Sequence, residues 1–332
     1  MSRSDADYLD AAAALAERAR PLSRPNPGVG AVLVADGRVI ARGWTRAGGR
    51  PHAEAVALDA AGGAARGATL YVTLEPCAHV SARGPSCTSL VIASGVARVV
   101  VGCEDPDPRT AGQGITAMLA AGIAAEVLPN AGARASLAGY LTRVAAGRPH
   151  VTLKLATSLD GCIALADGTS RWITGPEARA HAHLERARAD AILVGRKTLY
   201  DDQPRLDVRL EGLERQSPKR YVLSRDPDWH ATLGELTSPT GWTSVADPTA
   251  VDAFGDAQYL MVEGGAGAAA AFLRADLVDR LLLYRAPIVI GGGRPSVSDI
   301  GLATLDPAHG RWRLANTRML GSDRLEVYER TR

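Results

Sequence analysis

The chain has 332 residues, of which 46% are hydrophobic and 22% charged, a composition typical of a globular protein rather than a disordered one. The 38 Lys and Arg residues nearly balance the 36 Asp and Glu residues, which leaves a formal net charge of +2 at pH 7. Proteins dedicated to nucleic acids or anionic membranes carry a one-sided surface charge, so neither partner is expected. No apolar run approaches the roughly 20 residues that span a bilayer, and the N-terminus shows no signal-peptide pattern. We therefore expect a cytoplasmic protein.

The first half of the chain alternates between helical and strand-like patterns. Helical patterns cover residues 5–20, 52–61, 112–121 and 132–146, and strand-like patterns cover residues 30–34, 38–43, 68–74 and 98–102. Residues 35–37 read as a hairpin turn between the first two strands. This alternation predicts an α/β layer with a mostly parallel sheet.

A domain boundary is predicted after the helical pattern of residues 132–146. That pattern ends in Gly147, Arg148 and Pro149, and a glycine followed by a proline stops a helix before the next strand. We place the boundary between residues 148 and 149. The chain then has two domains, residues 1–148 and 149–332, as its length favours.

The second half repeats the α/β pattern. Strands are predicted over residues 150–157, 190–194, 220–223, 259–262 and 280–285. The polar stretch 203–219 is predicted to be a long surface loop. An Arg-rich helix over residues 178–189 contains His181 and His183, which we interpret as part of a solvated face rather than as metal ligands.

A cluster of metal-ligating residue types follows the first strands. His52 begins a helical pattern, Cys77 follows a strand, and Cys87 comes after nine intervening residues. One imidazole and two thiolates fill three positions of a catalytic zinc site and leave the fourth for water. Glu54, two residues after His52, is placed to move protons at that water, as in nucleobase deaminases with the pattern H-x-E…P-C-x-x-C. The longer spacer leaves open a closed structural site completed by His79, or two unconnected core cysteines.

Four segments of the first half resemble the deaminase half of the bifunctional riboflavin-biosynthesis deaminase/reductase family. They read RPNPGVGAVLV, PHAEAVAL, LYVTLEPCAH and VVVGCEDPDPRTAGQGITAMLAAGI. A long spacer between the cysteines is normal in that family. The resemblance implies a cytidine-deaminase-like αβα fold in which His52, Cys77 and Cys87 bind Zn²⁺, Glu54 is the catalytic proton carrier and Asn26 contacts the substrate base.

Three positions depart from the family pattern. Thr45 stands where a histidine is common, Asp107 replaces a frequent asparagine, and the spacer that contains Arg83 is longer than usual. These departures leave the zinc ligands intact and bear on substrate contacts near Thr45 and Arg83.

The second half contains a glycine loop, Gly265–Ala266–Gly267, between a strand and an Ala-rich helix. Such a loop can bind a phosphate at a helix start, but it is also common as a plain structural turn. A strict Rossmann fingerprint needs a carboxylate about 20 residues further on, and none is present there.

Four further motifs resemble the C-terminal reductase of the same family, which has a dihydrofolate-reductase-like α/β fold and uses NADPH. They are K-L-A-x-S-L-D-G, S-x-W-I-T-G, V-G-x-x-T-L and V-E-G-G. The resemblance implies cofactor contacts from Ala156, Trp172, Thr198, Asp202, Gly265, Ala266 and Gly267, with Ser224 and Arg225 near the 2′-phosphate. It implies substrate contacts from Asn26 in the first domain and from Lys154, Ser170, Leu206, Arg209 and Glu263 in the second. Plain core packing stays an alternative for Trp172.

These patterns together predict a zinc hydrolase and an NADP-dependent oxidoreductase on one chain. The expected reactions are the hydrolytic deamination of 2,5-diamino-6-(5-phosphoribosylamino)pyrimidin-4-one and the reduction of its ribosyl group to a ribityl group. The small-molecule alternative is a related pyrimidine or pteridine-like metabolite. A nucleic-acid deaminase is disfavoured because only 5% of residues are aromatic, and the complete zinc set disfavours a catalytically silent scaffold. Self-association into a homo-oligomer is left open.

Overall fold

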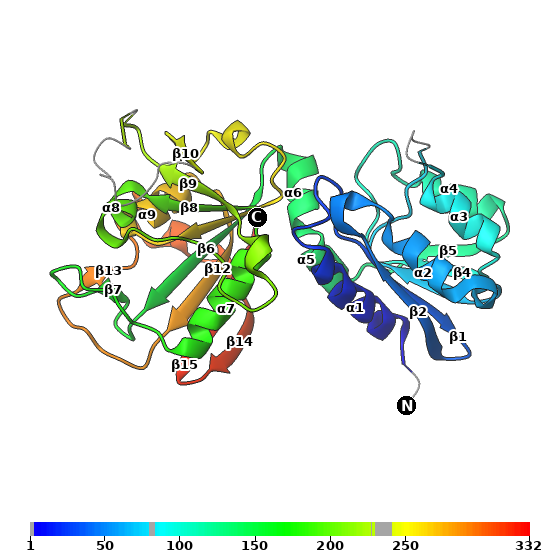
Figure 1. The fold of residues 1–332 in the computed structure, drawn as a ribbon, viewed down its shortest axis with the longest axis horizontal. Coiled ribbons are helices and arrows are strands. Elements are labelled where there is room, and N and C mark those ends of the chain that lie inside the picture. Colours follow the sequence, from blue (N-terminus) through cyan, green and yellow to red (C-terminus); the bar gives the residue numbers. More distant parts are fainter. Residues whose placement is uncertain (1–2, 80–83, 227, 230–240) are drawn as a thin grey trace. The chain divides into compact units, whose positions relative to one another are not determined.

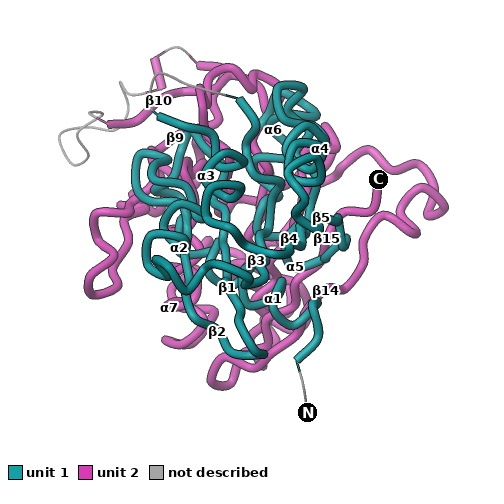
Figure 2. The backbone as a smooth tube through the Cα atoms, turned by 90° about the vertical axis from the view of Figure 1, so that its right-hand side faces the viewer, with its two compact units in different colours: residues 1–148 teal, residues 149–332 magenta. Residues whose placement is uncertain are grey.

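Two units make up the chain, Met1–Arg148 and Pro149–Arg332, coloured separately in Figure 2. The computed structural model (Figure 1) describes residues 3–79, 84–226, 228–229 and 241–332. Gly147 ends the last helix of the first unit in the left-handed conformation (φ 67°), so the units adjoin where the glycine and proline interrupt the sequence pattern. None of the described helices is long and apolar enough to cross a membrane.

The first unit is built on a five-stranded sheet with the order β2-β1-β3-β4-β5. The strands are β1 (Gly30–Ala35), β2 (Arg38–Trp44), β3 (Thr69–Val72), β4 (Arg98–Val101) and β5 (Ala124–Val127). Strand β1 runs antiparallel to both β2 and β3, whereas β3, β4 and β5 are parallel. The sheet is therefore mixed rather than mostly parallel, because the hairpin forms one of its edges.

Helices cover both faces of this sheet. They are α1 (Asp5–Ala16), α2 (Ala53–Ala61), α3 (Cys87–Ser94), α4 (Gln113–Ala120), α5 (Ala131–Ser136) and α6 (Ala138–Ala146). Side chains alternate between the faces along each strand. Leu33 and Leu70 point into the core that contains α2, α3 and α4, while Val32 and Tyr71 pack against α1. The result is a three-layered αβα unit (Figure 1).

The predicted helix over residues 132–146 is two helices, α5 and α6. Leu137 separates them at φ −98°, ψ 2°, and its side chain is almost fully buried in the core shared with the sheet. The local sequence is helical in pattern throughout, so the break follows from tertiary packing. Helix α3 and strand β5 were not predicted.

The second unit contains an eight-stranded sheet with the order β10-β9-β8-β11-β6-β12-β15-β14. Its strands are β6 (His150–Thr157), β8 (Ala191–Gly195), β9 (Lys219–Leu223), β10 (Trp242–Val245), β11 (Tyr259–Glu263), β12 (Val278–Arg285), β14 (Trp312–Leu320) and β15 (Asp323–Arg330). The six strands from β10 to β12 are parallel, and β15 and β14 complete the sheet in antiparallel fashion. A separate pair joins β7 (Cys162–Ala164) to β13 (Arg294–Pro295). Strands β7, β10, β13, β14 and β15 were missed by the sequence patterns.

Three α-helices pack on the large sheet: α7 (Pro176–Ala187), α8 (Arg196–Asp202) and α9 (Ala266–Arg274). Phe272 of α9 packs on one face, in the core that contains Leu153 and Val262. Leu199 of α8 and Ala182 of α7 lie in clusters formed by the strand residues of the opposite face.

The predicted long loop of residues 203–219 is confirmed, whereas the prediction about the Arg-rich helix is wrong. Within this loop, Leu206 and Val208 point inward and are 3% and 2% exposed. The Arg-rich helix is not solvated on its histidine face, because the His181 side chain is 9% exposed and its Nδ1 lies 2.7 Å from the Tyr284 hydroxyl. Both segments lie close to the large sheet, and its apolar surface accounts for their burial.

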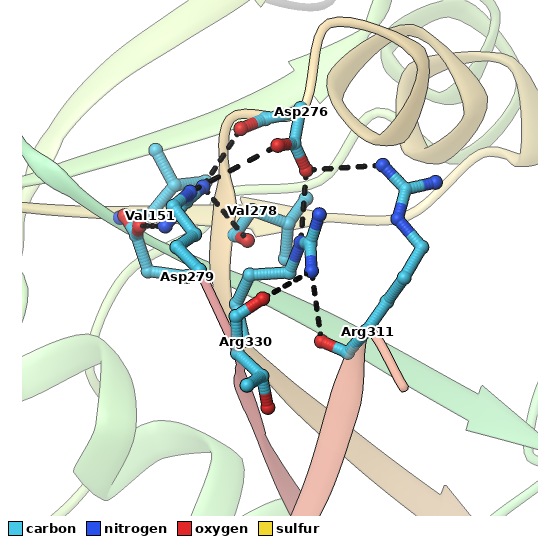
Figure 3. Close-up of polar contacts among 8 residues, drawn as sticks. Val151, Asp276, Val278, Asp279, Arg311 and Arg330 are labelled. Carbon is cyan, nitrogen blue, oxygen red and sulfur yellow. Dashed lines mark hydrogen bonds and ion pairs between the residues drawn. The ribbon is translucent and has the colours of Figure 1, made fainter. Parts of the chain in front are cut away.

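Within the second unit, charged side chains near the end of β15 and the start of β12 form a cluster of polar contacts (Figure 3). The Asp276 carboxylate accepts hydrogen bonds from Arg330 Nε at 2.9 Å and from Arg311 Nη2 at 3.3 Å. Nearby, Asp279 Oδ2 accepts the backbone N–H of Val151 at 2.8 Å. These contacts connect the end of β15 and the turn before β12 to the first residues of β6.

Because each unit has its own core, residues 1–148 and residues 149–332 are each expected to fold when expressed alone. Each fragment should show a single cooperative thermal transition by circular dichroism. A fragment that unfolds without cooperativity would contradict the independence of the two cores.

Candidate functional site

Three elements bring the predicted metal ligands together in the first unit. His52 is the residue before α2, Cys77 follows β3, and Cys87 is the first residue of α3. His52 Nδ1 lies 3.2 Å from Cys87 Sγ and 3.7 Å from Cys77 Sγ, and the three ligand atoms lie within 4.8 Å of one another. The backbone N–H of Cys87 also donates to Cys77 Sγ at 3.3 Å.

This donor set fits a zinc ion. In a tetrahedral zinc site with ordinary Zn–S and Zn–N bonds, nitrogen and sulfur ligands lie about 3.6 Å apart, close to both observed separations. A hydrogen bond from Cys87 is the main cause that lowers the pKa of the Cys77 thiol to about 4, whereas the same bond raises the pKa of Cys87. The lowered pKa favours the thiolate form of Cys77, which is the form that binds metals.

The sequence left open two other arrangements, a closed structural metal site and two unconnected core cysteines, and the described residues form neither. The two cysteines share one cluster, so they are not unconnected core residues. Over the described ranges, no fourth His, Cys, Asp or Glu completes the set, and His79 lies outside it. A closed structural site would require that fourth ligand. The three-residue set therefore matches the open arrangement of catalytic zinc sites rather than the closed arrangement of structural ones.

Glu54 lies in the first turn of α2, beside the metal ligands. Glu54 is 3% exposed, and burial raises the pKa of its carboxyl group to about 7. Its Oε2 atom is buried and has no hydrogen-bond partner among the described residues. Leaving a buried carboxyl oxygen unpaired is costly. Such an atom is suited to a ligand that approaches the metal cluster.

Asn26 lies against the same cluster. Its Nδ2 atom donates to the Gly49 carbonyl at 2.9 Å and lies 3.3 Å from His52 Nε2. A Cβ at Gly49 (φ 81°) would come within 2.7 Å of the Asn26 side chain, so only glycine allows this approach. Thr45 is different, because its buried hydroxyl accepts the Val29 N–H at 3.0 Å and supports the fold. Arg83 lies outside the described residues.

In the second unit, a glycine loop meets Thr198 beyond the carboxyl ends of the parallel strands. Gly265 precedes α9 at φ 73°, and a Cβ there would lie 2.7 Å from Thr198 Oγ1. No side chain of the described residues caps this helix start. Free backbone N–H groups at a helix start bind phosphate, and ligands bind at this edge of open α/β sheets. The loop fits a phosphate group of a dinucleotide.

Ser170 and Asp202 line one cavity of about 360 Å³. The other lining residues are Gly168, Thr169, Arg171, Asp201 and Gln203. Trp172 is 64% exposed, and the Arg179 guanidinium lies 4.6 Å from its ring centroid. The alternative that Trp172 is a core residue is therefore wrong. An exposed indole ring is available for stacking on a planar ligand.

Lys154 and Glu263 are neighbours on the paired strands β6 and β11. The Glu263 carboxylate is 3.9 Å from Lys154 Nζ, and it accepts two hydrogen bonds from Arg186, at 2.6 Å from Nε and 2.9 Å from Nη2. Burial alone would raise the pKa of Glu263, but the two cations outweigh it and lower the pKa to about 2. The site therefore contains a buried, ionised carboxylate.

Arg186 was missed by the sequence analysis, which treated its helix as solvated. Ala178, Ala182 and Arg186 recur every four residues, and the two alanines are buried. That spacing places all three on one helix face. It was the signal that could have predicted an inward-pointing guanidinium.

The remaining predicted residues of the second unit lie in β6 and in the loops after α8 and β9. Ala156 lies near the end of β6, Leu206 is buried, and Arg209 is half-exposed with its N–H 3.2 Å from His183 Nδ1. Ser224 follows β9, and its hydroxyl accepts the Asp226 N–H at 3.2 Å.

Comparison with known proteins decides the family. Residues 149–325 match the RibD C-terminal domain, and residues 2–103 match the cytidine and deoxycytidylate deaminase zinc-binding region. The riboflavin biosynthesis protein RibD of Aquifex aeolicus is 35% identical over 98% of both chains. The Mycobacterium tuberculosis RibD is 40% identical over 91% of this chain and 90% of its own. This chain belongs to the RibD family.

Solved structures agree with this assignment. Acinetobacter baumannii RibD superposes on this chain with a TM-score of 0.84 at 32% identity, and the match covers 99% of each chain. The Thermotoga maritima diaminohydroxyphosphoribosylaminopyrimidine deaminase/5-amino-6-(5-phosphoribosylamino)uracil reductase gives 0.82 at 30% identity, over 98% of this chain and 99% of its own. The RibD assignment confirms the predicted fold class and the prediction of a bifunctional deaminase and reductase of riboflavin biosynthesis.

Replacing Glu263 by Gln is expected to destabilise the second unit at pH 7 by about 3 kcal/mol, because it leaves Arg186 and Lys154 buried without their counter-charge. The folded-state pKa is lowered, to about 2. The carboxylate therefore stabilises the fold fully above the ordinary pKa of glutamate, and this contribution is lost as the pH falls toward 2. Urea unfolding should show a smaller difference from wild type at pH 3 than at pH 7.

The exposed Glu211 on the neighbouring loop provides the control. Glu211→Gln should change the free energy of unfolding little at either pH. A Glu263→Gln difference that does not depend on pH would contradict the assigned ion pair.

Proposed function

We propose that this RibD protein deaminates 2,5-diamino-6-(5-phosphoribosylamino)pyrimidin-4-one in residues 1–148. Residues 149–332 then reduce the ribosyl group of the product to a ribityl group with NADPH. The Thermotoga maritima relative, a diaminohydroxyphosphoribosylaminopyrimidine deaminase/5-amino-6-(5-phosphoribosylamino)uracil reductase, supports this pair of substrates. The metal-ligand cluster of the first unit supports deamination there, and the glycine loop and charged residues of the second unit support reduction there.

For deamination, His52, Cys77 and Cys87 would hold a single Zn²⁺. When bound, zinc activates a water molecule for attack on the ring carbon that bears the amine. Glu54 takes up a proton at Oε2 and passes it to the departing ammonia. The observation that carries this proposal is the buried, unpartnered Oε2 of Glu54 beside three converging metal ligands.

For reduction, NADPH supplies the hydride, and the chain supplies orientation. The backbone N–H groups of Gly265, Ala266 and Gly267 bind a cofactor phosphate, and the exposed Trp172 stacks on a planar part of the cofactor. Ala156, Thr198, Asp202 and Ser224 complete the cofactor contacts at the carboxyl ends of the strands.

The sugar phosphate of the substrate would lie beside these cofactor contacts. Arg209 presents a half-exposed guanidinium, whose planar fork matches a phosphate. Lys154, Ser170, Leu206 and Glu263 form the rest of the predicted substrate site. In the first unit, Asn26 contacts the pyrimidine beside His52.

Replacing Glu54 by Gln is expected to leave one zinc per chain and to reduce ammonia release by at least a thousandfold, because the amide cannot carry the proton. Elemental analysis and an ammonia assay measure the two quantities. Asp59→Asn, on the exposed end of the same helix, is the control and should retain activity. Persistent deamination by Glu54→Gln would remove Glu54 from its assigned role.

Replacing Arg209 by Ala is expected to raise the KM for the phosphorylated substrate of reduction at least tenfold, with a much smaller effect on the KM for NADPH. Loss of a charge-assisted contact to phosphate gives this asymmetry. Arg205→Ala removes a neighbouring guanidinium that also pairs with Asp207 and should change neither value. Equal changes in both KM values for Arg209→Ala would show that the residue does not bind the substrate phosphate.

A further inference from the structure

Glu75 is a buried carboxylate that neither the metal cluster nor the assigned substrate contacts use. The residue is 2% exposed and lies two positions before Cys77. Its Oε1 accepts the backbone N–H groups of Gly114 at 3.0 Å and Ile115 at 3.2 Å. Its Oε2 accepts those of Gly112 at 3.0 Å and Asp105 at 3.3 Å. All four bonds go to the segment of residues 105–115.

Three of these donors belong to the start of helix α4. The first N–H groups of any helix lack partners within it, and a side chain at the N-cap position usually accepts one of them. The N-cap of α4 is Gly112 at φ 72°, which has no side chain to do so. Glu75 therefore caps α4 from the end of a different element, with a negative charge at the positive end of the helix dipole.

The segment that Glu75 holds extends to the metal cluster. Asp105 Oδ1 accepts the Asp107 N–H at 3.0 Å and the Tyr140 hydroxyl at 2.8 Å, which fixes the turn that follows. A Cβ at Gly114 would lie 2.5 Å from the Pro76 carbonyl oxygen and 3.0 Å from Thr88 Oγ1, so the start of α4, where this loop ends, packs against the turn that carries Cys77.

A second set of bonds holds Cys77 itself. The Thr88 hydroxyl lies 3.0 Å from the Pro76 carbonyl and 3.1 Å from the Cys77 carbonyl, and the Thr88 N–H donates to Cys77 at 3.2 Å. Thr88 belongs to α3, the helix that also carries Cys87. The metal-ligand turn is thus fastened to α3, whereas the Glu75 carboxylate bonds only toward the loop and α4.

We propose that Glu75 is a positioning residue for deamination, which holds the loop of residues 105–112 at the metal cluster so that the loop can bind the pyrimidine substrate. The proposal rests on the deaminase activity proposed above. It separates two functions of neighbouring residues: Thr88 maintains the metal ligands, and Glu75 maintains the substrate loop.

The test is Glu75→Gln in the full-length, zinc-loaded chain. The amide has the same shape, but its NH₂ group faces two backbone N–H donors that lose their acceptor. We expect the KM for deamination to rise at least tenfold, with kcat within threefold of wild type. One zinc per chain should be retained, and the reductase activity of the same chain should be unchanged. Glu104→Gln, an exposed carboxylate on the same loop, is the matched control.

Any of three results for Glu75→Gln would overturn the proposal: an unchanged KM for deamination, a loss of zinc, or a parallel fall of the deaminase and reductase activities. Variants of Thr88 test the other half of the proposal, which is that Thr88 maintains the metal ligands. Thr88→Val should lower zinc retention because the shared hydroxyl is removed, and Thr88→Ser should restore it. Zinc retention by Thr88→Val equal to that of wild type would contradict the separate roles.

Hydrogen exchange gives a readout that does not depend on the substrate. In Glu75→Gln, amide exchange of residues 112–115 should accelerate at least tenfold, while exchange in α3 and in the second unit stays as in wild type. Unchanged exchange would contradict the proposal. Wild-type protein that fails to deaminate the pyrimidine would instead contradict the proposed function, and the exchange result would still decide whether Glu75 holds the loop.

Discussion

The deaminase site depends on one geometric constraint: an imidazole nitrogen and two sulfurs must meet at the ends of three separate elements. His52 and Cys87 occupy the starts of α2 and α3, and Cys77 lies in the turn after β3. Both helices pack in the same core on one face of the sheet and contact each other, which brings these starts together. The same arrangement buries Glu54 in the first turn of α2 and leaves its Oε2 without a hydrogen-bond partner among the described residues. Residues that maintain the helix starts, such as Thr88 and Glu75, therefore contribute to chemistry that they do not perform.

The reductase unit places its charged residues by a different principle. Its candidate site residues include Glu263 at the end of β11 and residues that follow β8, β9 and β11, at the carboxyl edge of the parallel strands, where ligands bind in open α/β sheets. At this edge Glu263 is held ionised between Arg186 and Lys154, and the helix start at Gly265 is left uncapped by side chains of the described residues. In the proposed reaction, the free N–H groups bind a phosphate of the cofactor, and the ordered carboxylate belongs to the separate site of the sugar phosphate substrate.

Much of this organisation could be predicted from local sequence. The spacing of His52, Glu54, Cys77 and Cys87, the glycine loop at Gly265 and the stop at Gly147 are all encoded by residue types at short range. The sequence patterns failed where tertiary packing decided the outcome. Burial of Leu137 divided a continuous helical pattern, and the apolar face of the large sheet drew Arg186 inward with Ala178 and Ala182. The capping of α4 by Glu75 joins residues far apart in the chain, and no local pattern reveals it.

X-ray absorption at the zinc edge tests the central claim most directly, because it counts ligands by element without requiring a substrate. Purified, unchelated protein should show one zinc per chain, bound by two sulfurs near 2.3 Å and by one histidine nitrogen, with a light-atom ligand from solvent completing a tetrahedron. The absence of zinc, a third sulfur, or a second histidine in the coordination shell would contradict the account.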